Sequence, residues 1–263
     1  MTSSRPMVGL LALFACTACT ASPAEPMELR VLSYNIKRGL GNDNQTDISR
    51  AAALIRRVSA DLVLLQEIDK GVRRSGRVDQ MRVLAELTGL NARFGAFMPY
   101  QGGDYGIGLM SRYPILKSDN HVLPEGAEPR TAVDARLRLP NGDELLLCSV
   151  HLYRTEEQRL AQARALVELY RGTRIPMIVG GDFNSRPGSS VMDLVERHWI
   201  NTDKGEDRFT MSATNPRSEI DYILYRPASR FEVISIDVLD EPVVSDHRPV
   251  LMVLRLLPVE GGQ

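Results

Sequence analysis

Two repeating patterns of apolar and polar residues alternate along the chain. In the segment 155–171 the apolar residues recur every three or four positions, which predicts an amphipathic helix. Thr155 and Gln158 suit a capping box at its start, and Gly172 can end it. The same spacing predicts further helices over 47–59, 78–88 and 190–197. Four helices are therefore expected, separated by long non-helical stretches.

The stretches between these helices hold the short apolar runs that are typical of β-strands. The runs 29–32, 62–65 and 175–179 predict buried strands. Further strands are predicted near 91–97, 105–111, 115–123, 131–139, 144–152, 220–226, 231–238 and 248–256, with Asn141-Gly142 as a hairpin turn. So many strands with so few helices cannot form one parallel sheet, so we expect two packed sheets with helices outside. The pattern does not give the strand order.

Composition and charge narrow the class of protein. The 263 residues hold no repeat and no linker, so one domain over 28–263 is expected. The formal net charge is −1, which disfavours a general nucleic-acid binder, because phosphate contacts call for a basic surface. One dense basic stretch, 70–82, directly follows Glu67. It either overhangs the site described below and meets an anionic substrate, or it is a solvated loop and helix start.

Residues 1–27 differ from the rest of the chain. Arg5 precedes an apolar run over 7–15 that is too short to span a bilayer and is typical of a signal peptide. The run ends in Leu13-Phe14-Ala15-Cys16, which resembles a bacterial lipobox, with Cys19 as a second candidate. We expect a lipid on Cys16, a tether over 17–27 and attachment to the membrane of the bacterial cell envelope. The alternative is an exported protein cleaved near Ala24.

The predicted domain contains one cysteine, Cys148, which lies in a predicted strand. A single cysteine cannot form a disulfide within the domain, so a disulfide framework is excluded. Cys148 is expected to pack as a small apolar residue. His121 and His198 are expected to be structural or exposed, and Trp199 is expected to pack under the helix that ends at Arg197.

Five short polar motifs follow or interrupt the apolar runs: Ser33-Tyr34-Asn35, Leu65-Gln66-Glu67, Gly180-Gly181-Asp182-Phe183-Asn184, Ile220-Asp221-Tyr222 and Ser245-Asp246-His247. Carboxylates and amides at the ends of buried strands are costly to dehydrate unless they bind something. Oxygen ligands of this kind suit Mg²⁺. The motifs together predict one Mg²⁺ site with an acid–base histidine beside it.

Together with Pro129-Arg130 and Val150-His151-Leu152, these motifs resemble the endonuclease/exonuclease/phosphatase superfamily in type and order. The resemblance runs from about Glu28 to Leu256. It implies a four-layer α/β sandwich, in which two packed mixed β-sheets are flanked by helices and the site lies at one end of the sheets.

The resemblance also implies a metal site. Glu67 would be the principal ligand, Asn35 would bind or orient the metal or a phosphate oxygen, and Asp246 would add a second carboxylate. The expected cofactor is Mg²⁺, with Mn²⁺ as a substitute.

Further residues receive catalytic roles from the same resemblance. Asp182 would orient or deprotonate the attacking water, and Asn184 would hold phosphate. His247 would be the acid–base residue, with Asp221 fixing its tautomer and favouring imidazolium.

His151 and Arg130 are the remaining candidates. His151 would contact phosphate or the leaving group, and Arg130 would clamp phosphate. DNase-like members pair this second histidine with a glutamate, whereas here the corresponding stretch offers no acid except Asp104.

We therefore expect a monomeric Mg²⁺-dependent phosphoesterase, in particular a phosphodiesterase that uses metal- and His-assisted attack by water. A DNA or RNA endonuclease is an alternative, disfavoured by the charge and by the lack of an obvious aromatic and basic strip. A sphingomyelin or phospholipid diesterase would suit the membrane location, but no aromatic hairpin insertion is apparent. A phosphatase for sugar or inositol phosphates also remains open. A catalytically inactive binding lipoprotein is the alternative from another class, although decay would normally remove at least one of the motif residues.

Overall fold

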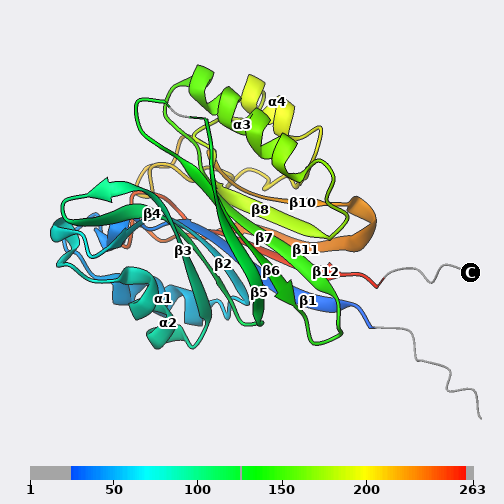
Figure 1. Cartoon of the computed structure of the whole chain (residues 1–263), viewed down its shortest axis with the longest axis horizontal. Helices are drawn as coiled ribbons and strands as arrows, with labels where there is room; N and C mark the ends of the chain where they lie inside the picture. The colour runs from blue at the N-terminus through cyan, green and yellow to red at the C-terminus, as the bar shows by residue number, and fades with distance from the viewer. Residues whose placement is uncertain (1–24, 125, 259–263) are drawn as a thin grey trace, which may run out of the picture.

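The computed structural model describes residues 25–124 and 126–258 (Figure 1). The predicted signal peptide, Cys16 and Cys19 lie outside these residues. No helix within the described part of the chain is long and apolar enough to cross a bilayer. Met27, expected at the end of the tether, already belongs to the first strand.

The first sheet has the strand order β11-β12-β1-β2-β4-β3. Its strands are β1 (Met27–Asn35), β2 (Leu62–Lys70), β3 (Asn91–Tyr100), β4 (Gly103–Ser111), β11 (Phe231–Val238) and β12 (Val250–Leu256). β1 and β2 run parallel, whereas β1 and β12 run antiparallel, so the sheet is mixed.

The second sheet has the strand order β5-β6-β7-β8-β10-β9. Its strands are β5 (Ile115–Val122), β6 (Thr131–Arg138), β7 (Glu144–His151), β8 (Met177–Asp182), β9 (Ile200–Asn201) and β10 (Asp221–Arg226). β7 and β8 are parallel, and the other pairs are antiparallel. The predicted Asn141-Gly142 turn joins β6 to β7.

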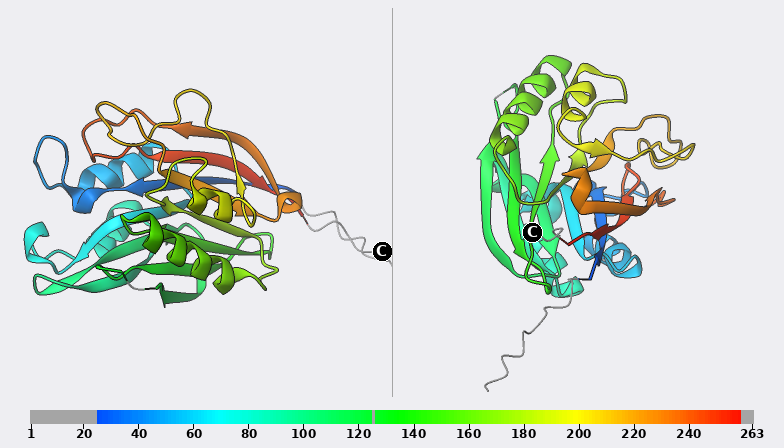
Figure 2. Two further views of the ribbon diagram at one scale, coloured as in Figure 1. Left: turned by 90° about the horizontal axis from the view of Figure 1, so that it is seen from above. Right: turned by 90° about the vertical axis from the view of Figure 1, so that its right-hand side faces the viewer.

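Helices cover the outer face of each sheet. α1 (Ile48–Arg57) and α2 (Gln80–Thr88) lie on the first sheet, and α3 (Glu156–Tyr170) and α4 (Ser190–Val195) lie on the second (Figures 1 and 2). One apolar cluster fills the space between the sheets, with Leu64, Ile107 and Ile178 among its fully buried members. Two further clusters lie under the helix pairs. The predicted four-layer sandwich is confirmed.

Local details differ from the expectations at three places. Thr155 caps no backbone N–H of α3, because its Oγ1 donates to Gln158 Oε1 at 2.9 Å, so the predicted capping box is not formed. The residue that follows α3, Arg171, has right-handed helical angles, and Gly172 is not left-handed. The two-residue strand β9 was not predicted. Trp199 is buried under α4, as expected.

The strand order brings the polar motifs together. His151, Asp182 and Asp221 lie side by side in register on β7, β8 and β10. On the other sheet, Asn35 lies beside Gln66, and the Gln66 Nε2 donates to Ser149 Oγ of the second sheet at 3.2 Å. Both sets of residues therefore meet at one end of the interface between the sheets.

Candidate active site

A cavity of about 380 Å³ opens at this end of the sheets. Its lining includes seven of the residues predicted from the motifs: Glu67, Arg130, His151, Asp182, Asn184, Asp246 and His247. Asn35 and Asp221 are buried directly behind it and contact its lining. A larger cavity of about 760 Å³ lies beside β9 and contains none of the predicted residues.

Glu67 reaches the cavity because β2 is irregular there. It lies within the strand and not after its end, and the pairing of β2 with β4 shifts register between Leu65 and Ile68. The backbone of Glu67 is left-handed, with φ 58°, a conformation that costs energy for a residue with a side chain. Asn35 Nδ2 donates to Glu67 Oε1 at 3.3 Å. The bulge thus aims this carboxylate at the site.

Asp182 is the centre of the polar contacts. Its Oδ1 accepts the backbone N–H of Asn184 at 2.8 Å, and its Oδ2 accepts Asn35 Nδ2 at 3.2 Å. The Nε2 atoms of His151 and His247 lie 3.4 Å and 3.8 Å from the same Oδ2. Burial and the nearby Asp221 carboxylate raise the pKa of Asp182 to about 7. Asp182 can therefore exchange a proton near neutral pH.

The chain passes close behind Asp182. Gly181 has φ +145°, and a Cβ added there would lie 1.9 Å from the backbone oxygen of Val150. Only glycine allows β7 and β8 to approach this closely at the site. Asn184, two residues beyond Asp182, is left-handed with φ 50°, and its Nδ2 donates to the backbone oxygen of Leu152 at 3.0 Å.

His247 forms a buried pair with Asp221. Its Nδ1 lies 2.9 Å from Asp221 Oδ2, so Nε2 faces the cavity. Burial alone would lower the pKa of His247, but the charge and hydrogen bond of Asp221 outweigh it and raise the pKa to about 10. Ser245 Oγ accepts the backbone N–H of His247 and donates to the backbone oxygen of Asn35 at 2.6 Å. These two hydrogen bonds hold the loop that carries His247 against β1.

His151 has the opposite electrostatic setting. Burial, together with the nearby Arg130 and His247, holds the pKa of His151 well below its ordinary value. Its ring packs edge-on against Phe97 with centroids 6.2 Å apart. The acid it faces is Asp182. Asp104, the one acid that the sequence offered nearby, lies at the start of β4 and does not line the cavity.

Arg130 and Asp246 already have charged neighbours. Arg130 is buried, its Nη1 lies 2.5 Å from Glu128 Oε1, and its guanidinium stacks on Phe97 at 4.7 Å and on Tyr153 at 5.5 Å. Asp246 Oδ2 lies 2.7 Å from the amine of Lys37. The structure thus places a lysine, which sequence reasoning had not considered, next to the carboxylate assigned to the metal.

An arginine that the motifs did not mark also lines the cavity. Arg74 donates from Nε and Nη2 to both oxygens of the buried Asp69, at 2.9 and 2.8 Å. Its guanidinium stacks on the rings of Tyr100 and Tyr105 at 4.5 and 4.9 Å. The other basic residues of the 70–82 stretch, Lys70, Arg73, Arg77 and Arg82, are exposed and do not line the cavity.

Two arginines and four aromatic rings therefore pack against one another in one cluster, of which Arg74, Tyr100, Tyr105 and Arg130 line the cavity. We call Arg74, Tyr100, Tyr105, Phe97, Arg130 and Tyr153 the arginine–aromatic wall. The expectation that the chain lacks such a strip is wrong. It was missed because its members come from separate strands and loops and form no run in the sequence.

Comparison with known proteins decides the family. The model of the Endonuclease/Exonuclease/phosphatase family matches residues 32–247. The chain belongs to this family. It is 28% identical over 239 residues to the uncharacterized protein YbhP of Escherichia coli (strain K12), a match that covers 84% of this chain and 94% of that one.

Solved structures share the fold of this family member. An endonuclease/exonuclease/phosphatase from Beutenbergia cavernae has a TM-score of 0.72 at 25% identity, covering 88% of this chain and 72% of that chain. The human Nocturnin catalytic domain with bound sulfate has a TM-score of 0.67 at 22% identity, covering 86% and 94%. The mannosyl-6-phosphatase Bt3783 of Bacteroides thetaiotaomicron has 0.67 at 20% identity, covering 86% and 99%.

The family is generally dependent on divalent metals, and the residues present fit such an ion. Glu67 is half-buried at the cavity and forms no ion pair within the described residues. Its carboxylate supplies oxygen donors, which suit Mg²⁺ more than the nitrogen and sulfur sets preferred by zinc. Asn35 turns its Nδ2 toward Glu67 and Asp182 while its Oδ1 accepts the backbone N–H of Lys37, so in this geometry Asn35 orients the carboxylate and is not itself a ligand. Asp182, Asp221 and His247 also lie close enough to hold an ion, with donor atoms within 4.8 Å of one another. Asp221 and His247 pair with each other at 2.9 Å, so the half-buried Glu67 is the cavity carboxylate more available to an ion.

Proposed function

We propose that this chain is a Mg²⁺-dependent phosphodiesterase of the bacterial cell envelope. The observation that carries the proposal is the contrast between two buried neighbouring groups, Asp182 and His247, whose Oδ2 and Nε2 atoms lie 3.8 Å apart. Asp182, with a pKa of about 7, is available as a base, whereas His247, with a pKa of about 10, holds a proton at neutral pH. A base and an acid side by side are what hydrolysis of a phosphate ester by water needs.

The chain's own residues divide the reaction between them. Asp182 orients a water and takes its proton as the water oxygen bonds to phosphorus. The bond from phosphorus to the leaving oxygen breaks, and His247 can donate the proton it holds at Nε2 to that oxygen. Asp221 keeps the imidazolium charged and fixes its orientation at 2.9 Å. The positioned groups thus supply both proton transfers.

Other groups bind the phosphate and stabilise its charge. Arg130, beside the catalytic groups, is always charged and supports the binding of an anion. Neutral His151 and Asn184 offer hydrogen bonds to phosphoryl oxygens. When bound, Mg²⁺ held by Glu67, which Asn35 orients, would neutralise charge that develops on the phosphoryl group.

A nuclease is the second candidate, and the arginine–aromatic wall favours it. Stacked arginine and tyrosine planes suit nucleobases and a second phosphate. The mannosyl-6-phosphatase has the same fold, so phosphomonoesters of sugars also belong among the substrates to be tested. An inactive binding lipoprotein is disfavoured by the complete set of metal-binding, basic and acidic groups around the cavity.

A hydrolysis panel tests the proposal. Bis-p-nitrophenyl phosphate, plasmid DNA, RNA, sphingomyelin, phosphatidylinositol and sugar phosphates are incubated with the mature protein and Mg²⁺, with and without EDTA. Asp182→Ala serves as the inactive variant, and Asp104→Asn serves as a matched control, because Asp104 lies outside the cavity lining. We expect diester hydrolysis that EDTA and Asp182→Ala abolish. Hydrolysis of none of these substrates by the Mg²⁺-loaded protein would contradict the proposal.

The envelope location is tested separately. We expect the protein in the membrane fraction of its bacterial host with a lipid on Cys16, and we expect Cys16→Ser to release it while Cys19→Ser does not. Mass spectrometry that finds an unmodified N-terminus near Glu25 in the soluble fraction would refute the anchor and leave the activity open.

A further inference from the structure

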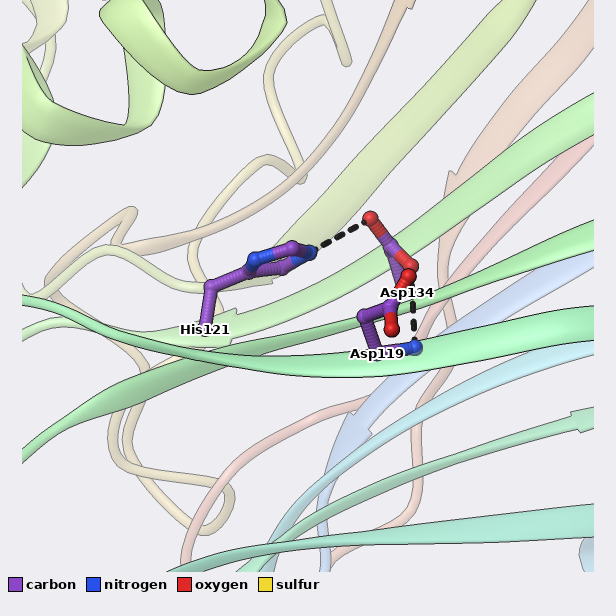
Figure 3. Close-up of side chains that lie close together, drawn as sticks. All are labelled: Asp119, His121 and Asp134. Atoms are coloured by element: carbon purple, nitrogen blue, oxygen red, sulfur yellow. Dashed lines mark hydrogen bonds and ion pairs between the residues drawn. The ribbon is translucent and has the colours of Figure 1, made fainter.

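We propose a second metal site, for a first-row transition ion such as Zn²⁺, at Asp119, His121 and Asp134 on the outer face of the second sheet (Figure 3). One donor atom from each side chain lies within 4.8 Å of the others. The three residues come from the neighbouring strands β5 and β6 and share no lining residue with the catalytic cavity. The proposal is therefore independent of the proposed function.

The strand register forces two negative charges together at this place. Asp119 of the edge strand β5 pairs directly with Asp134 of β6, so both carboxylates project from the same face. Like charges directly opposite each other destabilise a sheet. Asp134 is also 93% buried, which makes its charge costlier still. A divalent cation between the two carboxylates would remove the repulsion.

His121 supplies the nitrogen that distinguishes this group from a cluster of acids. It follows Asp119 by two positions, so both side chains leave the same face of β5. Its Nε2 lies 2.9 Å from Asp134 Oδ2, and a neutral ring with its proton on Nδ1 would present the lone pair of Nε2 to an ion at this position. One imidazole and two carboxylates form a donor set that zinc and its neighbours accept.

The buried ligand is held in place by groups that are not themselves ligands. The Tyr170 hydroxyl, near the end of α3, donates to Asp134 Oδ2 at 2.9 Å, and the backbone N–H of Asp119 donates to Oδ1 at 3.3 Å. Hydrogen bonds of this kind orient metal ligands and are costly to lose. The Cys148 thiol lies 3.4 Å from the Tyr170 hydroxyl, and its sulfur does not belong to this group of donor atoms.

There is room for the ion and for water ligands. A cavity of about 360 Å³ is lined by all three residues, and a second of about 380 Å³ also reaches His121. Neighbouring ligand atoms of a tetrahedral zinc ion are about 3.3 Å apart, so donor atoms that lie within 4.8 Å of one another must approach by up to about 1.5 Å. The half-exposed Asp119 side chain permits this movement.

Two cations lie nearby, and neither blocks the site. Lys117 Nζ is 2.6 Å from Asp119 Oδ2, but its side chain is 71% exposed, so solvent screens the pair and an ion can displace it. Arg136 forms an ion pair with Glu144 of β7.

Zinc binding to the metal-free protein tests the proposal, with saturating Mg²⁺ present to occupy the catalytic site. Calorimetry should show one zinc per chain that Asp119→Asn and His121→Ala weaken by at least about tenfold. Zinc at a hundredfold excess over its Kd should raise the Tm by about 5 °C, because it binds only the folded chain. The two variants should lose this shift. Asp207→Asn and His198→Ala, changes of the same types elsewhere on the molecule, should keep it.

The outcomes separate clearly. Equal zinc binding by the wild type and both variants, or no zinc-dependent rise in Tm, would overturn the site. Loss in only one of the two variants would overturn the three-residue ligand set. Should His121→Ala fail to fold, Asp119→Asn decides the question, since its side chain is 41% exposed and its removal leaves the core intact.

Discussion

Replacing Asp182 by asparagine should make the protein more stable at alkaline pH while removing its activity. The carboxylate is 98% buried, and burial with the neighbouring Asp221 raises its pKa from 3.8 to about 7. Holding Asp182 ionised in the folded state therefore costs free energy that a neutral asparagine of the same shape does not. A buried catalytic carboxylate of this kind lowers the free energy of unfolding.

The sign and size of the effect depend on pH. Below pH 3.8 the carboxyl is protonated in both states and there is no penalty. As pH rises from 3.8 to about 7, the unfolded chain releases the proton and the folded chain keeps it, so the free energy of unfolding falls. At about 1.4 kcal/mol per pKa unit, the penalty is about 2 kcal/mol at pH 5 and about 4 kcal/mol at pH 8. Above pH 7 it stays constant.

Comparing the stability of the variant with that of the wild type at pH 5 and at pH 8 isolates the cost of ionising Asp182. Asparagine loses hydrogen bonds and weakens the attraction that keeps His247 protonated, but the folded state holds that proton at both pH values, since the pKa of His247 is raised to about 10. Only ionised Asp182 attracts His247, and this attraction is already contained in the Asp182 pKa of about 7, so it adds no separate contribution to the pH dependence. We expect the stability of Asp182→Asn relative to the wild type to increase by about 2 to 3 kcal/mol between pH 5 and pH 8.

Urea unfolding in EDTA provides the measurement. Trp199 is the single tryptophan and is buried, so its fluorescence reports unfolding directly. Asp207→Asn, at an exposed position, is the matched control and should show no such difference. A change below about 0.5 kcal/mol between the two pH values would refute the assignment of Asp182 as a strained buried acid.

Three further predictions concern the chemistry. EDTA should abolish hydrolysis and Mg²⁺ or Mn²⁺ should restore it, because the Glu67 carboxylate offers oxygen donors; full turnover in excess chelator would contradict this. His247→Ala should lower kcat by about 10² to 10⁴. The double mutant with Asp182→Ala should lose far less activity than the product of the two single effects. A single mutant whose kcat stays within about threefold of the wild-type value would exclude the assigned role. Arg74→Lys keeps the charge but loses the paired hydrogen bonds to Asp69. It should therefore raise KM for substrates with a second phosphate and leave KM for bis-p-nitrophenyl phosphate unchanged. Equal changes in KM for both kinds of substrate would show that Arg74 takes no part in substrate recognition.

The sequence pattern predicted the layers and most elements because hydrophobic burial repeats regularly. Strands such as β7 and β8 are almost continuously apolar, and α1 has one apolar face, so each could be identified from its own residues. The strand order could not be obtained in this way, because it depends on pairing between distant segments. β9 was missed since two residues carry no periodicity.

The candidate site was predictable where a motif follows a strand and unpredictable where tertiary contacts decide. The motifs marked His151, Asp182 and Asp221, which the structure aligns on three adjacent strands. The pairing of Lys37 with Asp246 joins residues more than two hundred positions apart and has no local pattern. The position of Arg74 also depends on distant residues, because its guanidinium packs on two tyrosines of the next hairpin in addition to its pairing with Asp69.

The direction of β1 gives the catalytic cavity an orientation relative to the membrane. Met27 begins this strand and Asn35 ends it, so the point where the tether joins the domain and the asparagine beside Glu67 are separated by about 27 Å of extended chain. With a lipid on Cys16, as proposed, β1 acts as a rigid spacer that holds the cavity at the far side of the domain from its anchor. Such an arrangement favours phosphate esters that diffuse in the surrounding aqueous compartment over headgroups of the bilayer that carries the protein.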